Sequence, residues 1–165
     1  MIVIRPRNSS PTGGFRTHRR ASTPRRLVCG HPAEASCSSF DQIEIGMVVS
    51  LGVAVVDETA MKAFVSAFAP HWEVERGAPE AMVFAIWSRL DQEASAAWPQ
   101  TKRLGVDALR WMRNPPAGEL LRGRMTIMGK DPVGESKGVV IAQHDVLDEA
   151  GRLVFSCLTR SIFAR

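Results

Sequence analysis

The sequence predicts an α+β domain in which an antiparallel sheet surrounds one long central helix. A helical segment that begins at Ala78-Pro79-Glu80 contains seven consecutive apolar side chains, Ala81 to Trp87. One strand-like segment precedes this helix, and four follow it without another helical pattern. A helix that is apolar on all sides must be buried, and a sheet wrapped around it would bury it.

The segments before the central helix predict a strand and a short helix. Residues 48–56 alternate in the manner of a strand with one apolar face, formed by Val49, Leu51, Val53 and Val55. Asp57 is placed to cap the next helix, because its carboxylate can accept from free amides of the first turn. That helix should end near Pro70 and bury a single stripe of side chains, namely Met61, Phe64, Val65 and Phe68.

The central helix is expected to run to about Trp98, with Pro79 and Glu80 in its first turn. Its second half carries polar side chains that we expect in solvent, namely Arg89, Asp91, Gln92 and Glu93. The strands that follow are predicted at residues 104–113, 120–128, 137–147 and 152–163. Prolines in the 114–118 segment end the first of them, and 148–151 forms a turn. Leu121, Met125 and Ile127 should face inward, and Cys157 reads as a small buried apolar residue.

Charge is unevenly distributed along the chain. Residues 1–39 contain seven arginines and one acid, whereas residues 40–165 contain 14 basic and 16 acidic side chains. The first segment has too little apolar periodicity to fold, so we expect a disordered Arg-rich extension at 1–39 and one domain at 40–165. The composition of residues 1–39 leaves three alternatives open, namely a transit peptide, a basic arm and an extension without function. The basic total therefore does not predict nucleic-acid binding by the domain.

The sequence does not predict a membrane-spanning helix, a disulfide framework or a zinc site. The longest apolar run has seven residues, against about 20 for a membrane-spanning helix. Cys29, Cys37 and Cys157 form no C-x-x-C pair, which favours neither a disulfide framework nor a metal site. We therefore expect a cytoplasmic protein that needs no metal and contacts neither membrane nor nucleic acid.

Several short segments resemble one family. Phe40 to Gly46 is similar to an opening F-x-D-I-x-x-G, and Val56-Asp57-Glu58 followed by Ala63-Phe64 is similar to V-T-E-x-D-I-x-x-F. Residues 85–90 resemble A-L-W-x-R-L, and residues 109–118 resemble L-R-W-x-R-P-V-x-P-G-D. In this order and spacing over residues 40–165, they resemble the MaoC-like dehydratases and (R)-specific enoyl-CoA hydratases of the hotdog-fold superfamily. The resemblance implies a homodimer with acyl-thioester clefts at its interface.

The resemblance also implies an Asp and a His, spaced as D-x-x-P-x-H, between the two helices. The Asp position holds Ala69, so the expected catalytic Asp is not found. A gap before Pro70 would place His71 on the family His and Glu73 on an acid that often follows it. A gap after His71 would lose the His and put Glu80 where a Gly is usual. In the family, an amide near the start of the central helix polarises the thioester carbonyl, which here points to Gly77 and Ala78.

We therefore predict a lyase of fatty acid metabolism that adds or removes water at C2–C3 of an acyl-CoA or acyl-carrier thioester. His71 is the expected base and Glu73 its orienting acid. Trp72 is a candidate wall of the acyl tunnel and Arg110 a candidate partner of coenzyme A phosphates. Trp87 is assigned to substrate binding or to the core, and coenzyme A enters only as part of the substrate. The alternatives are a hotdog thioesterase using Glu73, Glu75 or Glu80, and a catalytically degenerate binding or partner subunit.

Overall fold

The computed structural model describes residues 37–165. The predicted extension, residues 1–39, lies outside this range except for its last three residues. Cys37 is 6% exposed and packs within the core. The Ser39 hydroxyl accepts from the Asp41 amide at 3.1 Å and caps a short 3₁₀ helix, η1 (Phe40–Gln42). Within residues 37–165, no helix is long and apolar enough to cross a membrane.

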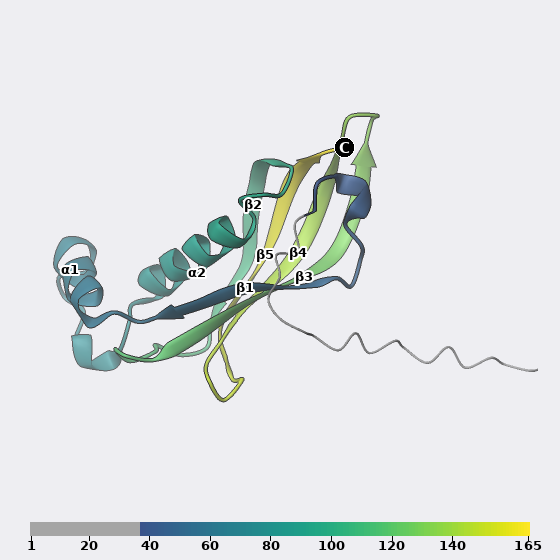
Figure 1. The fold of residues 1–165 in the computed structure, drawn as a ribbon. Helices are drawn as coiled ribbons and strands as arrows, with labels where there is room; N and C mark the ends of the chain where they lie inside the picture. Colours follow the sequence, from purple (N-terminus) through teal and green to yellow (C-terminus); the bar gives the residue numbers. More distant parts are fainter. Residues whose placement is uncertain (1–36) are drawn as a thin grey trace, which may run out of the picture. The chain divides into compact units, whose positions relative to one another are not determined.

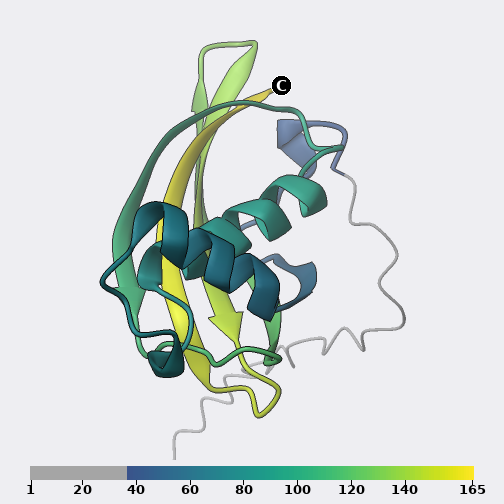
Figure 2. The same cartoon turned by 90° about the vertical axis from the view of Figure 1, so that its left-hand side faces the viewer.

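Five antiparallel strands form one sheet in the order β1-β3-β4-β5-β2 (Figure 1). The strand bounds are β1 Val48–Val55, β2 Gln100–Trp111, β3 Leu120–Val133, β4 Lys137–Leu147 and β5 Leu153–Ala164. The sheet curves around the central helix α2 (Glu80–Ala94), as Figure 2 shows. The predicted α+β architecture is confirmed. Each predicted strand is present, and β4 has the predicted bounds.

The core lies between α2 and the inner face of the sheet. Alternate residues of β3 and β4 are buried on this face, as a pleated strand requires. The inward direction predicted for Leu121, Met125 and Ile127 is confirmed, and so is the burial of Cys157. Burial raises the pKa of the Cys157 thiol to about 12, so this cysteine is a packing residue rather than a nucleophile.

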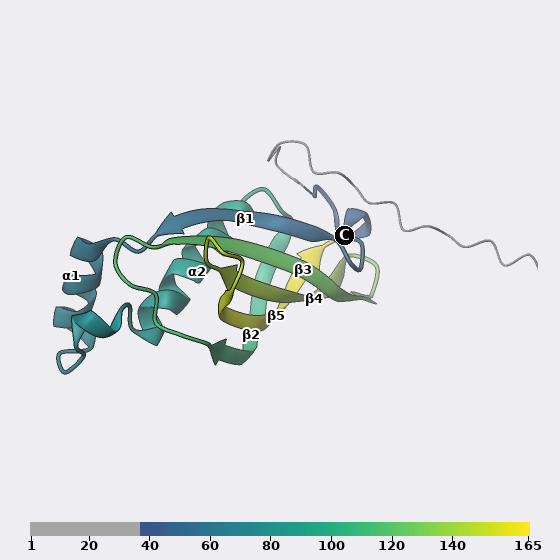
Figure 3. The same ribbon diagram turned by 90° about the horizontal axis from the view of Figure 1, so that it is seen from below.

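Helix α1 (Glu58–Phe68) begins where the sequence predicts. The Asp57 carboxylate accepts from the Ala60 amide at 2.7 Å, which confirms the predicted N-cap. The predicted apolar stripe is only half right, because Met61 and Val65 are buried whereas Phe68 is 76% exposed. The reason is position: α1 lies beyond one end of the sheet, and the short helix η2 (Val74–Arg76) lies beside it (Figure 3).

Helix α2 differs from its prediction in two ways. It ends at Ala94, because Ser95 leaves helical geometry and its hydroxyl donates to the Asp91 carbonyl at 2.6 Å. Its first half is not enclosed on all sides, since Ala81 and Ala85 are exposed. Asp91 is also not in solvent as predicted: it is 1% exposed and faces the sheet.

Lys130 ties η1 to the sheet. Its ammonium donates to the carbonyls of Ile43 at 2.7 Å and Phe40 at 3.2 Å, and it lies 4.7 Å from the centre of the Phe40 ring. We expect Lys130→Met to lower the free energy of unfolding by about 1–3 kcal/mol, because these carbonyls lose a charged donor. Denaturant titration measures the change. Exposed Lys102→Met is the control, and equal losses in the two variants would contradict the assigned role.

Candidate functional site

The segment before α2 is clamped to the loop between β2 and β3. The Ala78 amide donates to the Pro115 carbonyl at 2.8 Å, and the Asn114 side-chain amide donates to the Ala78 carbonyl at 2.8 Å. Gly77 has φ +92°, and a Cβ there would lie 2.7 Å from the carbonyl oxygens of Asn114 and Pro115. Only glycine fits this contact, so the backbone entering α2 has a fixed path.

Trp72 stabilises the same segment from the other side. Its indole nitrogen donates to the Gly77 carbonyl at 2.9 Å, and the Arg76 guanidinium lies over its ring at 4.5 Å. The side chain is half-buried. Trp72 therefore holds the loop against the start of α2, next to the predicted catalytic residues.

His71 and Glu73 lie on this loop, and both are exposed. Within residues 37–165, no hydrogen bond or ion pair joins their side chains. The loop therefore presents a histidine and a carboxylate to solvent without assembling them into a dyad. Their assignment as base and orienting acid stays a prediction.

The start of α2 offers backbone amides to a ligand. The amides of Gly77 and Ala78 are occupied by the carbonyls of Val74 and Pro115, and Pro79 has no N–H. Met82 and Val83 donate to the Pro79 carbonyl at 2.9 and 3.0 Å. No hydrogen bond within the described part of the chain uses the amides of Glu80 and Ala81. The carbonyl donor expected near Gly77 and Ala78 is thus better supplied by the amides of Glu80 and Ala81, at the positive end of the helix dipole.

An apolar surface borders these two amides. The Trp111 indole donates to the Glu80 carbonyl at 3.0 Å, which places the end of β2 beside the first turn of α2. Trp111 is 39% exposed and Met112 is 60% exposed. An acyl group bound at the helix start would find apolar contacts here.

The remaining predicted binding residues lie elsewhere. Trp87 has no exposed surface and packs against Phe84, Phe155 and His144, as a core residue does. Arg110 is exposed on β2 opposite Ser156. No ion pair within residues 37–165 engages its guanidinium, and its expected contact with coenzyme A phosphates stays a prediction. The nearby Arg113 is not available, because hydrogen bonds to Glu119 and Asp148 engage it and raise its pKa.

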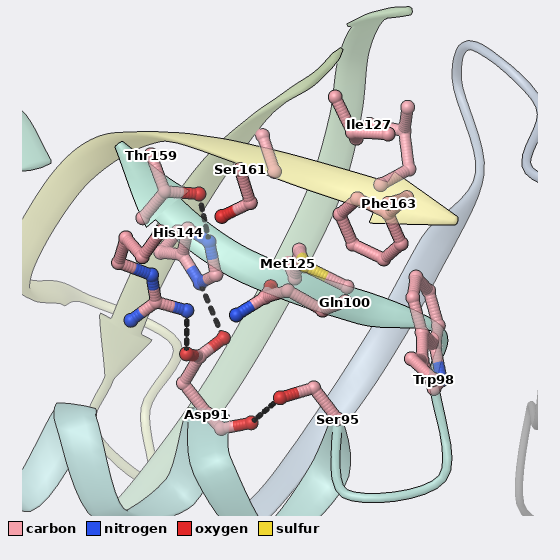
Figure 4. A pocket seen from close by; sticks show the side chains of 13 residues that line it. Asp91, Ser95, Trp98, Gln100, Met125, Ile127, His144, Thr159, Ser161 and Phe163 are labelled. Atoms are coloured by element: carbon pink, nitrogen blue, oxygen red, sulfur yellow. Dashed lines mark hydrogen bonds and ion pairs between the residues drawn. The ribbon is translucent and has the colours of Figure 1, made fainter. Parts of the chain in front are cut away.

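A second polar cluster, undetected by sequence reasoning, lies inside the domain (Figure 4). The Asp91 carboxylate on α2 pairs with Arg103 on β2, and its other oxygen lies 3.6 Å from His144 Nδ1 on β4. His144 Nε2 lies 2.9 Å from the Thr159 hydroxyl on β5. His144 is 1% exposed, which confirms the expectation of a buried, hydrogen-bonded histidine. We call these four residues the Asp91 cluster.

Burial controls the protonation of His144. Removal of the imidazole from water lowers its pKa to about 4, while the Asp91 carboxylate acts in the opposite direction and Arg103 adds to the lowering. The ring is therefore neutral at neutral pH. The spacing of residues on α2 held a signal for this cluster, because Asp91 follows Trp87 by four positions and Val83 by eight and so shares their buried face.

The Asp91 cluster and the loop of His71 form two separate sites. The cluster borders a cavity at the C-terminal end of α2, whereas His71, Trp72 and the free amides lie at its N-terminal end. None of the residues that line this cavity is a site residue predicted from the sequence. The cavity therefore does not belong to the predicted acyl-thioester site.

A curved antiparallel sheet around a single central helix defines the hotdog fold. No model of a known protein family matches the sequence, and no curated protein matches it. A MaoC-like dehydratase from Rhodospirillum rubrum superposes with a TM-score of 0.69 at 21% identity, over 77% of this chain and 97% of that one. An R-hydratase from Pseudomonas aeruginosa gives 0.57 at 19% identity, over 77% and 85% of the two chains.

Two further solved structures broaden the comparison. A conserved hypothetical protein from Mycobacterium tuberculosis with a double hotdog fold gives a TM-score of 0.64 at 18% identity, over 76% of this chain and 44% of that one. A hypothetical thioesterase from Streptococcus pneumoniae with coenzyme A gives 0.50 at 10% identity, over 75% and 83%. At these identities the likeness establishes the fold, and the predicted hotdog architecture is confirmed.

Proposed function

We propose that this protein acts on acyl thioesters as a MaoC-like dehydratase or hydratase, adding or removing water at C2–C3 of an acyl-CoA. The observation that carries the proposal is the pair of free amides of Glu80 and Ala81 at the start of the central helix, beside the exposed Trp111. The hotdog neighbours named as dehydratase and R-hydratase support the same reaction class.

Two groups would catalyse hydration, namely the free amides at the start of α2 and His71 with Glu73. The two amides would donate hydrogen bonds to the thioester carbonyl oxygen, where negative charge develops when water adds to C3. His71 would take a proton from the attacking water, and the proton would return to C2 of the enolate. Glu73 would orient the imidazole. Arg110 remains a proposed partner of coenzyme A phosphates, because no ion pair of the described residues engages it.

We propose that a second copy of the chain completes the cleft. β2 is an edge strand of the sheet and exposes Leu104, Leu109 and Trp111. Unpaired backbone groups and apolar side chains at an edge favour pairing with another strand. A homodimer joined through β2 would cover this edge next to the α2 amides, and sedimentation velocity would detect it.

We expect His71→Ala to lower the rate of crotonyl-CoA hydration by about 100-fold or more, because the attacking water loses its base. Loss of the enoyl-thioester absorbance measures the rate. Gln92→Ala is the control, since it removes an exposed polar side chain near the C-terminal end of α2, away from the proposed site. Hydration that continues at the wild-type rate in His71→Ala would exclude His71 as the base, and an inactive wild type would contradict the proposed reaction.

A thioesterase is the second candidate, favoured by the place of Glu80. Its carboxylate is exposed and belongs to the first residue of α2, next to the free amides. A carboxylate there could attack the thioester carbon or activate water. A thiol reagent separates the two reactions, since only hydrolysis releases free coenzyme A. Acyl-CoA binding without either reaction would favour the degenerate binding subunit, which the Ala69 position also suits.

A further inference from the structure

The cavity beside the Asp91 cluster has two unlike halves. It lies between the C-terminal end of α2 and the inner face of the sheet, and its volume is about 10 Å³. One half is apolar, lined by Trp98, Met125, Ile127, Val140 and Phe163. The other half is polar, and Figure 4 shows His144, Thr159, Ser161 and Gln100 around it.

Three buried polar atoms of residues that line this cavity lack a partner among the described residues, namely Ser161 Oγ, His144 Nδ1 and Arg103 Nε. Ser161 is 3% exposed, and its hydroxyl makes no hydrogen bond with the described residues. His144 Nδ1 is also unpartnered, because Asp91 at 3.6 Å lies beyond hydrogen-bond distance. Leaving a buried polar group unpaired costs about 1–3 kcal/mol, so several such atoms around one cavity indicate a ligand.

Size and charge restrict what this ligand is. A cavity of about 10 Å³ is close to the minimum for one water molecule. Asp91 and Arg103 already neutralise each other, so the site holds no unmatched charge for an ion. Ser161 can donate or accept, and Gln100 offers both an amide donor and a carbonyl acceptor. A small neutral ligand that both donates and accepts hydrogen bonds satisfies these groups.

We propose that this cavity is a binding site for one water molecule, held by Ser161, His144 and Gln100. The water is an integral part of the core: it gives His144 of the Asp91 cluster its missing hydrogen bond and so joins β2, β4 and β5. This site goes beyond the proposed acyl-thioester function, since it lies at the other end of α2 and contains none of that function's residues.

Nuclear Overhauser contacts between water and side chains test the site in the intact protein. We expect the wild type to show a long-lived water in contact with the His144 ring and the Thr159 methyl group. Ser161→Val should abolish these contacts, because it removes the hydroxyl and fills the cavity. Ser156→Ala should retain them, since Ser156 is a buried serine of the same strand that bonds Gln143 instead.

The wild-type spectrum decides the proposal even where Ser161→Val does not fold. A cavity without long-lived water in the wild type would overturn it, and so would contacts that persist in a folded Ser161→Val variant. Ser161→Ala gives a second comparison, since it removes the hydroxyl without filling the space. We expect it to shorten the residence time of the water at least tenfold.

Discussion

Replacing Asp91 by alanine is expected to lower the free energy of unfolding by about 3–5 kcal/mol. Asp91 is 1% exposed, and its carboxylate is the partner of the Arg103 guanidinium. Without it, Arg103 keeps its charge beside the buried His144 and Trp87 with no counter-ion. Such a loss would be a large part of the total stability of a domain of this size. Guanidinium chloride unfolding followed by tryptophan fluorescence measures the change.

A matched control separates burial from charge. Glu93 is on the same helix and pairs with Arg89 at 3.5 Å, but both side chains are 64% exposed. Glu93→Ala should change the free energy of unfolding by no more than about 1 kcal/mol, because solvent screens this pair. The double variant Asp91→Met with Arg103→Met should regain much of the loss, since neither charge is then left alone. A loss below about 1 kcal/mol in Asp91→Ala would show that the pair does not stabilise the fold.

The sequence predicts the parts of this fold that depend on local pattern. Alternation along the strands predicts β4 and its inward face, and the position of Asp57 predicts the start of α1. These features need only neighbours along the chain. The end of α2 is missed because its apolar content continues to Trp98, whereas the Ser95 hydroxyl bonds the Asp91 carbonyl and ends the helix earlier.

The Asp91 cluster shows what the sequence alone does not supply: helical spacing places Asp91 on a buried face, but it does not identify the partners of Asp91. The nearby Arg89, Gln92 and Glu93 suggest a solvent-facing half-helix, and the partners of Asp91 are 12 and 53 positions further along the chain. Only the packing of α2 across β2 and β4 brings them together. The predicted acyl-thioester site is limited in a different way. The sequence points to His71 and its loop, but the choice of donor amides depends on which ones the backbone already uses.

Acid should destabilise the protein between about pH 6.5 and pH 4 through His144. Its pKa falls from an ordinary 6.5 to about 4 in the folded protein, chiefly because burial disfavours the charged ring. In this window the unfolded chain binds the proton and the folded chain does not, so the free energy of unfolding decreases as the pH falls. A shift of this size corresponds to about 3 kcal/mol of the free energy of unfolding. This stability is fully present above pH 6.5 and is lost by pH 4.

Unfolding titrations at several pH values test this dependence. Besides Asp91 and Arg103, the charge of Asp145 acts on the ring, and it raises the pKa. Asp148 does not contribute to the slope in this pH range. The Arg152 amide lowers the pKa of the Asp148 carboxyl to about 2, so the stability that this carboxylate provides is lost only below its ordinary pKa of 3.8. His144→Gln should flatten the profile between pH 6.5 and 4, while Gln92→Ala, which removes an exposed side chain that does not titrate, should keep the wild-type slope. An unchanged slope in His144→Gln would assign the acid sensitivity to other groups.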